Sequence, residues 1–311
     1  MQPGYLQALE TGELKRRIDK AGQWSTRCCL CPRNCGVNRL EGELGFCRTG
    51  PLAQVAAFNL HFGEEAPLVG ENGSGTVFFG HCNLGCVFCQ NHDISDNQST
   101  HQEVHPNQLA WIFMQLQKQG AHNINLVTPS HVVLQVLQAL ELAAGDGLNI
   151  PLVYNTSSYD EVHTLKLLEG IVDIYLADSK FFYSEQARKY ADAPDYPQKA
   201  KEAILEMHRQ VGGLETDDQG IARRGLMIRH LVMPDNLAGS DEWLQFFAEN
   251  LSKDTFLNIM GQYRPAGMAH NYPELLGRVS GNQVETLNKK ARKLGLTNLD
   301  QRSSGIFRLL V

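Results

Sequence analysis

Six short apolar runs, each followed by a segment with helical periodicity, follow one another from residue 75 onward. The runs are rich in Val, Ile, Leu and Phe, which favours buried strands. Strands that alternate with helices form a parallel sheet with right-handed crossovers. The predicted strands are 76–79, 123–128, 151–155, 171–177, 226–234 and 255–260, and the predicted helices are 105–120, 132–145, 160–170, 196–213, 240–252 and 283–295. This order fits an open doubly wound α/β sheet or an incomplete (β/α)6 TIM-like barrel.

Polar or ionisable residues follow most of these predicted strands. They include the segments 128–131, 155–159, 178–180 and 262–264, and the pair Arg229 and His230. In both α/β architectures the carboxyl ends of the strands carry the ligand site. We therefore expect these side chains to converge on one face.

Composition excludes several classes of partner. The 311 residues carry a net charge of −6, so a nucleic-acid partner is not expected. No apolar run reaches the length of a membrane span, and the first residues lack the apolar core of a signal peptide. We expect a cytoplasmic protein without a membrane partner.

All eight cysteines lie between residues 28 and 89, which is typical of metal or redox chemistry rather than of a disulfide framework. Cys82, Cys86 and Cys89 form a C-x3-C-x2-C loop after the first predicted strand. Three thiolates can hold three irons of a four-iron cluster and leave the fourth iron open for a cofactor. Phe88, just before the last cysteine, is placed to stack on a base.

A zinc knuckle is the alternative for this loop. It would need a fourth ligand from elsewhere, such as His81 or His92, because structural zinc takes four protein ligands.

Four further cysteines, Cys28, Cys31, Cys35 and Cys47, have the spacing C-x2-C-x3-C-x11-C. This spacing fits a structural zinc site, a second iron–sulfur cluster or free thiols. Cys29 lies next to Cys28, so the spacing leaves the identity of the first ligand open. The acidic pair Glu64 and Glu65, in the following stretch 61–70, either reaches the mouth of the site or is solvated.

The three-cysteine loop, with its aromatic residue, opens the first unit of a (β/α)6 chain and resembles the radical S-adenosylmethionine superfamily. Longer segments are similar to one branch of it, the pyruvate formate-lyase activating enzyme homologues often labelled PflX-like. These segments are "GSGTVFFGHCNLGCVFCQNHDIS", "LVTPSH", "VYNTSSY", "DIYLADSKFF", "YADAPDYPQKAKEAILEMHRQVG", "RGLMIRHLVMP" and "NIMGQYRPA". The resemblance runs from about Cys28 to about Leu296 and implies the incomplete (β/α)6 barrel.

The resemblance implies roles for the residues that match the family. Cys82, Cys86 and Cys89 are then ligands of a 4Fe-4S cluster, and Phe88 lies near the adenine of S-adenosylmethionine. The cluster and this cofactor are the implied cofactors, with zinc or a second cluster at the other four cysteines.

Further residues match the parts that hold the cofactor. Asp178 and Lys180 match a segment beside its methionine end, and His230 matches a histidine on its ribose side. Asn155 and Thr156 stand where the activating enzymes carry an Asp, so a cation site built on that Asp is in doubt.

The chain also departs from the family pattern. The glycine-glycine-glutamate motif that usually binds the cofactor's amino group is absent, and "TPSH" stands in its place. Thr128 is a candidate for that task. Tyr263, after the last strand, is a candidate for facing the substrate or relaying a hydrogen atom.

The implied activity is reductive cleavage of S-adenosylmethionine to a 5′-deoxyadenosyl radical that abstracts hydrogen, as in an activase of a glycyl radical enzyme. An electron donor such as flavodoxin or ferredoxin and a protein substrate are the implied partners. The alternatives are radical modification of another peptide or small molecule, and a non-catalytic metal-binding protein. We expect an N-terminal Cys-rich extension over 1–70, a core over 71–296 and a tail over 297–311.

Overall fold

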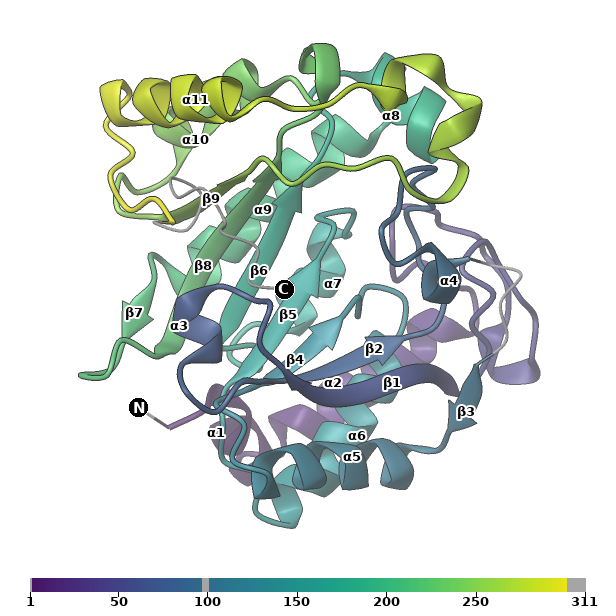
Figure 1. Ribbon diagram of the computed structural model, residues 1–311. Coiled ribbons are helices and arrows are strands. Elements are labelled where there is room, and N and C mark those ends of the chain that lie inside the picture. Colours follow the sequence, from purple (N-terminus) through teal and green to yellow (C-terminus); the bar gives the residue numbers. More distant parts are fainter. Residues whose placement is uncertain (1, 97–100, 301–311) are drawn as a thin grey trace.

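The computed structural model describes residues 2–96 and 101–300, and in them a nine-stranded sheet forms the centre of the molecule (Figure 1). Six neighbouring strands of this sheet are parallel and follow chain order, as the sequence predicts. They are β2 (Ser74–Phe79), β4 (Ile124–Val127), β5 (Leu152–Thr156), β6 (Ile174–Ser179), β8 (Ala222–Leu231) and β9 (Phe256–Met260). Among the described residues no ladder joins β2 to β9, so the row of parallel strands stays open.

Helices follow these strands at the predicted places, except that the helix over 184–191 was not predicted. They are α5 (Pro106–Lys118), α6 (Val133–Gly145), α7 (Val162–Leu167), α8 (Ser184–Ala191), α9 (Tyr196–Val211), α10 (Ser240–Asn250) and α11 (Gly281–Lys293). Local signals fix their ends. The backbone N–H of His105 donates to Gln108 Oε1 at 2.8 Å where α5 begins, which satisfies a group that the helix cannot pair. Gly212, at φ 71°, ends α9 in a conformation that favours glycine.

Three strands were not predicted. β1 (Ala53–His61) pairs antiparallel with β2, and β3 (Gln102–Val104) pairs with β1. β7 (Glu215–Thr216) pairs antiparallel with β8. β3 and β7 are short edge strands, and β1 lies between β3 and β2 with small and polar residues interspersed among its apolar ones, so the apolar pattern that marks a central parallel strand is missing from all three.

The N-terminal helix α1 (Gly4–Glu10) packs at the amino ends of the parallel strands, and the next helix, α2 (Glu13–Ser25), packs on α6. The N–H of Gly4 donates to Asp173 Oδ1 at 2.8 Å, just before β6 begins. The hydroxyl of Tyr5 donates to the carbonyl of Ile150 at 2.8 Å, just before β5. Tyr5 and Leu14 belong to the same continuous apolar core as the sheet. The segment predicted as an extension over 1–70 therefore shares its core with the rest of the chain.

The remaining parts are short or irregular. Residues 26–52 cross the carboxyl-terminal side of the sheet with one helical turn, Arg39–Glu41, and two short helices, α3 (Ala66–Val69) and α4 (His92–Ser95), flank β2. Of the tail predicted over 297–311, residues 301–311 lie outside the described residues.

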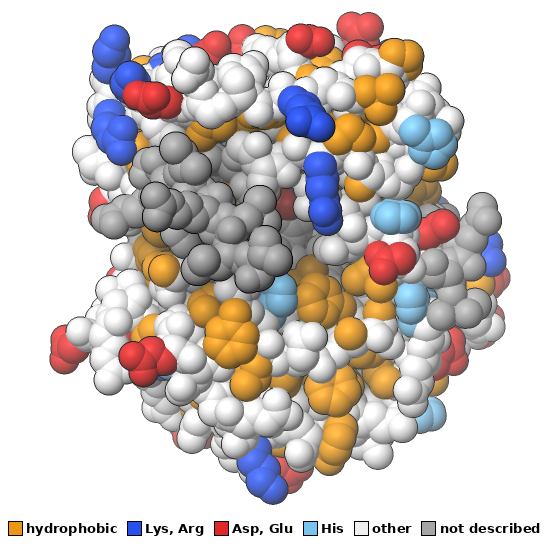
Figure 2. All heavy atoms as spheres, in the orientation of Figure 1, with side chains coloured by type: hydrophobic (Ala, Val, Ile, Leu, Met, Phe, Trp, Pro, Cys, Tyr) orange, Lys and Arg blue, Asp and Glu red, His pale blue; other side chains and the backbone are white. Residues whose placement is uncertain are grey.

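Two further observations concern the helices and the surface. In the described part of the chain, no helix is long and apolar enough to cross a membrane. On the face shown in Figure 2, basic side chains on the upper part are interspersed with acidic ones, and apolar side chains gather over the lower part.

Candidate functional site

A cleft of about 1350 Å³ opens at the carboxyl ends of the parallel strands. It is lined, among others, by Cys82, Cys86, Cys89, Asp178, Lys180 and Arg229. These residues come from the loop after β2 and from β6 and β8, so the sheet gathers them from distant parts of the chain. The volume exceeds that of an ordinary small-molecule pocket and has room for a cofactor together with part of a substrate.

The three-cysteine loop forms one wall of this cleft, and protein donors face its sulfurs. The N–H of Leu84 donates to Cys82 Sγ at 3.4 Å, and the Ser95 hydroxyl donates to Cys89 Sγ at 3.2 Å. Burial raises the pKa of the Cys82 and Cys86 thiols, and the positive charge of Lys180 opposes that shift. Thiolates at these positions therefore need a cation to stabilise them, and bound iron would supply it.

The spacing of the thiols bears on what the loop can hold. Within residues 2–96 and 101–300, no three His, Cys, Asp or Glu side chains already form a single-ion site. The four-iron cluster and the zinc knuckle both stay predictions for this loop.

Other contacts hold the loop against the core. Asn83 Nδ2 donates to the carbonyl of Tyr159 at 2.7 Å, and the N–H of Val87 donates to the carbonyl of Tyr190 at 2.9 Å. Phe88 is 4% exposed, lines the cleft and meets the ring of Phe181 edge-on at 5.7 Å. These contacts give the irregular loop a fixed shape.

Asp178 and Lys180 form an ion pair on the cleft wall, with Lys180 Nζ 2.7 Å from Asp178 Oδ2. Burial acts to lower the pKa of Lys180, but Asp178, Cys86 and Tyr196 together outweigh it and the pKa is raised. The other carboxylate oxygen, Asp178 Oδ1, is buried without a hydrogen-bond partner, and so is the hydroxyl of Ser157. A buried acceptor without a partner is costly, so a bound ligand with a donor group would be favoured at this wall.

The structure brings some of the other predicted residues to the cleft and leaves others in the core. Thr128 and Asn155 line it. Thr156, Tyr263 and His230, all among the described residues, do not. Thr156 lies 3.1 Å from the Ser130 hydroxyl, and the Tyr263 hydroxyl donates to the carbonyl of Leu275 at 2.8 Å.

His230 is fully buried, and both of its ring nitrogens have partners. Nδ1 lies 3.0 Å from the carbonyl oxygen of Ser179, and Nε2 lies 2.7 Å from the hydroxyl of Ser240. Burial lowers the pKa of His230 to about 4, so the imidazole is neutral. This geometry gives His230 the place of a core histidine rather than of a residue facing the cofactor.

A charged cluster at the cleft was only partly anticipated from the sequence. Arg229 donates through Nε to Glu65 Oε1 at 2.8 Å and also pairs with Glu64, while Asn258 Nδ2 donates to Glu65 Oε1 at 2.7 Å. Burial opposes ionisation of Glu64, but Arg229 and His61 together lower its pKa to about 2. Of the two places left open for this acidic pair, the mouth of the site is the correct one. The available signal was Arg229, which together with His230 interrupts the apolar run 226–234.

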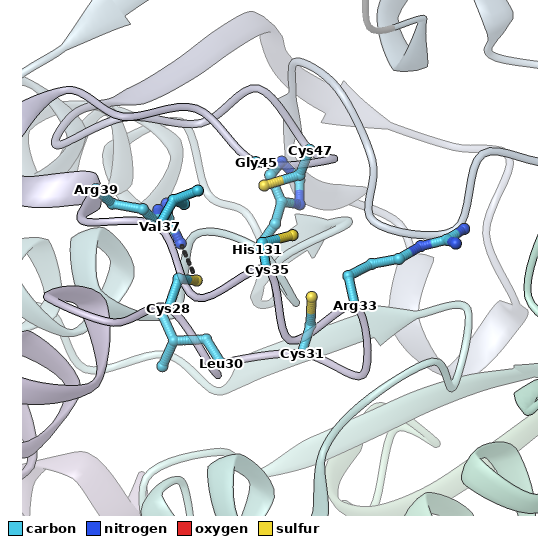
Figure 3. A pocket seen from close by; sticks show the side chains of 10 residues that line it. All are labelled: Cys28, Leu30, Cys31, Arg33, Cys35, Val37, Arg39, Gly45, Cys47 and His131. Atoms are coloured by element: carbon cyan, nitrogen blue, oxygen red, sulfur yellow. Dashed lines mark hydrogen bonds between the residues drawn. The ribbon is translucent and has the colours of Figure 1, made fainter.

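The other four predicted cysteines gather around a second, much smaller cavity (Figure 3). Cys28, Cys31, Cys35 and Cys47 all line it. Cys29 does not line it, although it is part of the described chain.

The comparisons place the chain in a family. It is 32% identical over 300 residues to a protein of Methanocaldococcus jannaschii, covering 94% of this chain and 82% of that protein. The chain belongs to the same family as this relative, which is the uncharacterized protein MJ0674. No protein-family model matches the chain.

Two solved structures show a weak likeness. A methylornithine synthase (PylB) has a TM-score of 0.46 and 14% identity, over 76% of this chain and 75% of that one. A radical SAM methyltransferase from Sphaerobacter thermophilus has a TM-score of 0.49 and 16% identity, over 72% of this chain and 64% of that one. Nothing below rests on this likeness.

Proposed function

We propose that this protein is a radical S-adenosylmethionine enzyme with an incomplete (β/α)6 barrel. The observation that carries the proposal is that Cys82, Cys86 and Cys89 share one cleft wall with the Asp178–Lys180 pair. Three thiols are one fewer than a closed four-iron cluster needs, so one iron would stay open toward the cleft.

The fit of the cofactor rests on the chain's own residues. The three cysteines would hold the cluster, which, when bound, supplies the electron that cleaves S-adenosylmethionine to methionine and a 5′-deoxyadenosyl radical. Asp178 Oδ1, the buried acceptor without a partner, would accept a hydrogen bond from the cofactor's ammonium group. This contact would replace the missing glycine-glycine-glutamate motif in binding the amino group. Phe88, which lines the cleft, would stack on the adenine.

The remaining cleft wall would serve the substrate. Arg229 is already paired with two carboxylates, so it presents a neutralised, rigid surface rather than a free cation. The open row of strands leaves room for a chain segment beside the cofactor. We propose that the substrate is a peptide backbone, as for an activase of a glycyl radical enzyme, with a small reductase such as flavodoxin or ferredoxin as electron donor.

The first experiment tests cofactor cleavage. The full chain is reconstituted without oxygen using iron and sulfide, reduced with S-adenosylmethionine present, and assayed for 5′-deoxyadenosine. The triple variant Cys82→Ser/Cys86→Ser/Cys89→Ser should give none, while Cys29→Ser, a thiol outside both cavities, should match the wild type. A fully loaded and reduced wild type that forms no 5′-deoxyadenosine, with or without candidate peptides, would refute the proposal.

A second experiment tests the role of Asp178. Equilibrium dialysis of S-adenosylmethionine against the reconstituted Asp178→Asn variant should show about 10- to 150-fold weaker binding, because a hydrogen bond to a charged group contributes about 1.5–3 kcal/mol. The substrate class is tested by electron paramagnetic resonance on mixtures with a glycyl radical enzyme. A doublet from a backbone glycine supports the activase. Turnover only with another peptide or a small molecule would move the protein to that alternative.

A further inference from the structure

The four N-terminal cysteines surround a closed space between the Cys-rich segment and the sheet. The cavity has a volume of about 10 Å³ and is lined by Cys28, Cys31, Cys35, Cys47 and His131 together with neighbouring side chains. Figure 3 shows the sulfur atoms of Cys28, Cys31 and Cys47 turned toward one central space. Cys28, Cys31 and Cys47 are each at most 7% exposed.

Positive and donor groups face these sulfurs from the surrounding chain. The guanidinium of Arg39 is 2% exposed and lies 4.0 Å from Cys28 Sγ. The N–H of Phe46 donates to Cys35 Sγ at 3.4 Å. A Cβ at Gly45 would lie 2.8 Å from Cys35 Sγ, so only glycine lets the backbone approach this sulfur.

His131 reaches the same cavity from the core of the protein. Its Nε2 lies 2.9 Å from the carbonyl oxygen of Gly80, which can only accept, so Nε2 carries the proton. Nδ1 is then left with a lone pair, and it is buried without any hydrogen-bond partner. The side chain is 1% exposed and lines the cavity. An imidazole with one nitrogen held by a carbonyl and the other free is arranged as a metal ligand.

We propose that one thiophilic divalent metal ion of the Zn²⁺ class binds among Cys28, Cys31, Cys35, Cys47 and His131 and takes its four ligands from these five side chains. The buried lone pair of His131 Nδ1 beside several sulfurs is costly without a cation and is satisfied by one. Zinc takes sulfur and imidazole nitrogen together in tetrahedral sites.

The size of the space favours a single ion over a second iron–sulfur cluster. A cavity of about 10 Å³ holds about one small atom. Because the described residues include no ready single-ion site, the sulfurs must draw together when the ion binds. The binding of a structural zinc ion is strong enough to drive that movement, because it can drive the folding of a whole small domain.

The site would also fix the three-cysteine loop of the cleft. Arg33, between two of the ligands, donates to the carbonyl of Asn83 at 2.9 Å and to that of Leu84 at 2.8 Å. His131 bonds to Gly80, on the other side of Cys82. An ion that orders the Cys-rich segment would therefore order the loop that we propose to hold the cluster, without itself entering the reaction.

The test uses the full-length chain with Cys82, Cys86 and Cys89 changed to Ser, so that a result at this site is independent of the proposed cluster. We expect about one zinc per chain by elemental analysis. Adding Cys31→Ser/Cys47→Ser should reduce it at least tenfold, and adding Cys29→Ser should not. Far-UV circular dichroism checks that each variant is folded. Less than a tenth of an equivalent of zinc in the parent, even after zinc is added, would overturn the proposal.

A second measurement avoids reliance on variants that fail to fold. Alkylation of the same parent chain, read by mass spectrometry with and without Zn²⁺, should show protection of Cys28, Cys31, Cys35 and Cys47. Cys29 is the internal control and should react equally in both samples. Equal reactivity of all five thiols would overturn the site, and so would iron and inorganic sulfide retained after anaerobic reconstitution of this parent, because they indicate a cluster.

The role of His131 is tested separately. His131→Gln keeps a donor for the Gly80 carbonyl but removes the Nδ1 ligand, so zinc affinity measured by chelator competition should fall at least tenfold. His122→Gln, a histidine outside the cavity, is the matched control and should leave the affinity unchanged. An unchanged affinity in His131→Gln would remove His131 from the ligand set.

Discussion

His230 makes the stability of the protein depend on pH in a way that can be calculated from its burial. The imidazole is fully buried, and its pKa in the folded protein is about 4. In the unfolded chain the pKa is about 6.5, so below that pH the unfolded state takes up a proton that the folded state does not. The contribution is present above about pH 6.5 and is lost as the pH falls toward 4.

The size of this effect follows from the two pKa values. The full difference corresponds to about 3 kcal/mol, of which about 2 kcal/mol is lost between pH 7 and pH 5. Urea unfolding of the full chain at these two pH values measures the loss. The His230→Asn variant keeps a donor for the Ser179 carbonyl but has no group that titrates, so its free energy of unfolding should fall by about 2 kcal/mol less than that of the wild type.

A matched control separates titration from general damage to the site. Ser179→Ala removes the hydroxyl next to the imidazole, 3.2 Å from Nδ1, without changing any titratable group. It should be less stable than the wild type at both pH values and lose the same amount of stability between them. If His230→Asn and the wild type lost equal amounts, His230 would not be a buried neutral histidine, and a role at the cleft would have to be reconsidered.

Three further changes have expected outcomes. Arg229→Met leaves two buried carboxylates without their cation, so the free energy of unfolding in urea at pH 7 should fall by about 3–5 kcal/mol. The loss should be smaller at pH 4, where the carboxylates take up protons. An equal loss at both pH values would contradict this. Gly75→Ala places a Cβ 2.7 Å from a backbone oxygen and should lower the stability of the protein by about 1–3 kcal/mol in thermal unfolding. Gly145→Ala, near the end of a helix with no atom within 4 Å of the new Cβ, should be neutral or stabilising in the same assay. Similar effects of the two substitutions would refute the steric argument. Arg33→Met removes the bonds to the three-cysteine loop, and alkylation of Cys82 should become several-fold faster; an unchanged rate would show that the loop is held without this arginine.

The parallel sheet could be predicted because its strands are buried on both faces. A strand such as β5 is buried at all five positions and begins with an apolar run, and the helices between such strands show the helical period. The helix α2 was missed although Leu14, Ile18 and Ala21 recur at helical spacing, because the segment as a whole is polar. Its stability comes from the packing of that narrow face on the core, which local sequence does not reveal.

On two strands the cleft is lined by one of two adjacent residues named from the sequence and not by the other. Side chains in a strand point alternately to the two faces, so of two adjacent polar residues only one reaches the cleft. Asn155 lines it and Thr156 does not; Arg229 lines it and His230 does not. The sequence shows both members of each pair as polar, and nothing local states which one faces inward.

The zinc site proposed at the N-terminal cysteines could also be predicted only in part from the sequence. Cysteine spacing predicted the four thiols, but His131 lies more than eighty residues further along the chain from Cys47 and belongs to the loop after β4. Its approach to the cysteines depends on how the Cys-rich segment folds over the sheet. Contacts of that kind follow from the tertiary structure alone.

The attachment of α1 at the amino ends of the strands has a practical consequence for handling the protein. The N–H of Gly4 is bound to Asp173, and the cleft opens at the opposite, carboxyl ends of the strands (Figure 1). An affinity handle joined to the amino end, or a surface to which that end is fixed, would therefore lie on the far side of the molecule from the cleft. Protein immobilised in this orientation presents the cleft to solution, where large candidate substrates can be screened on a sensor chip.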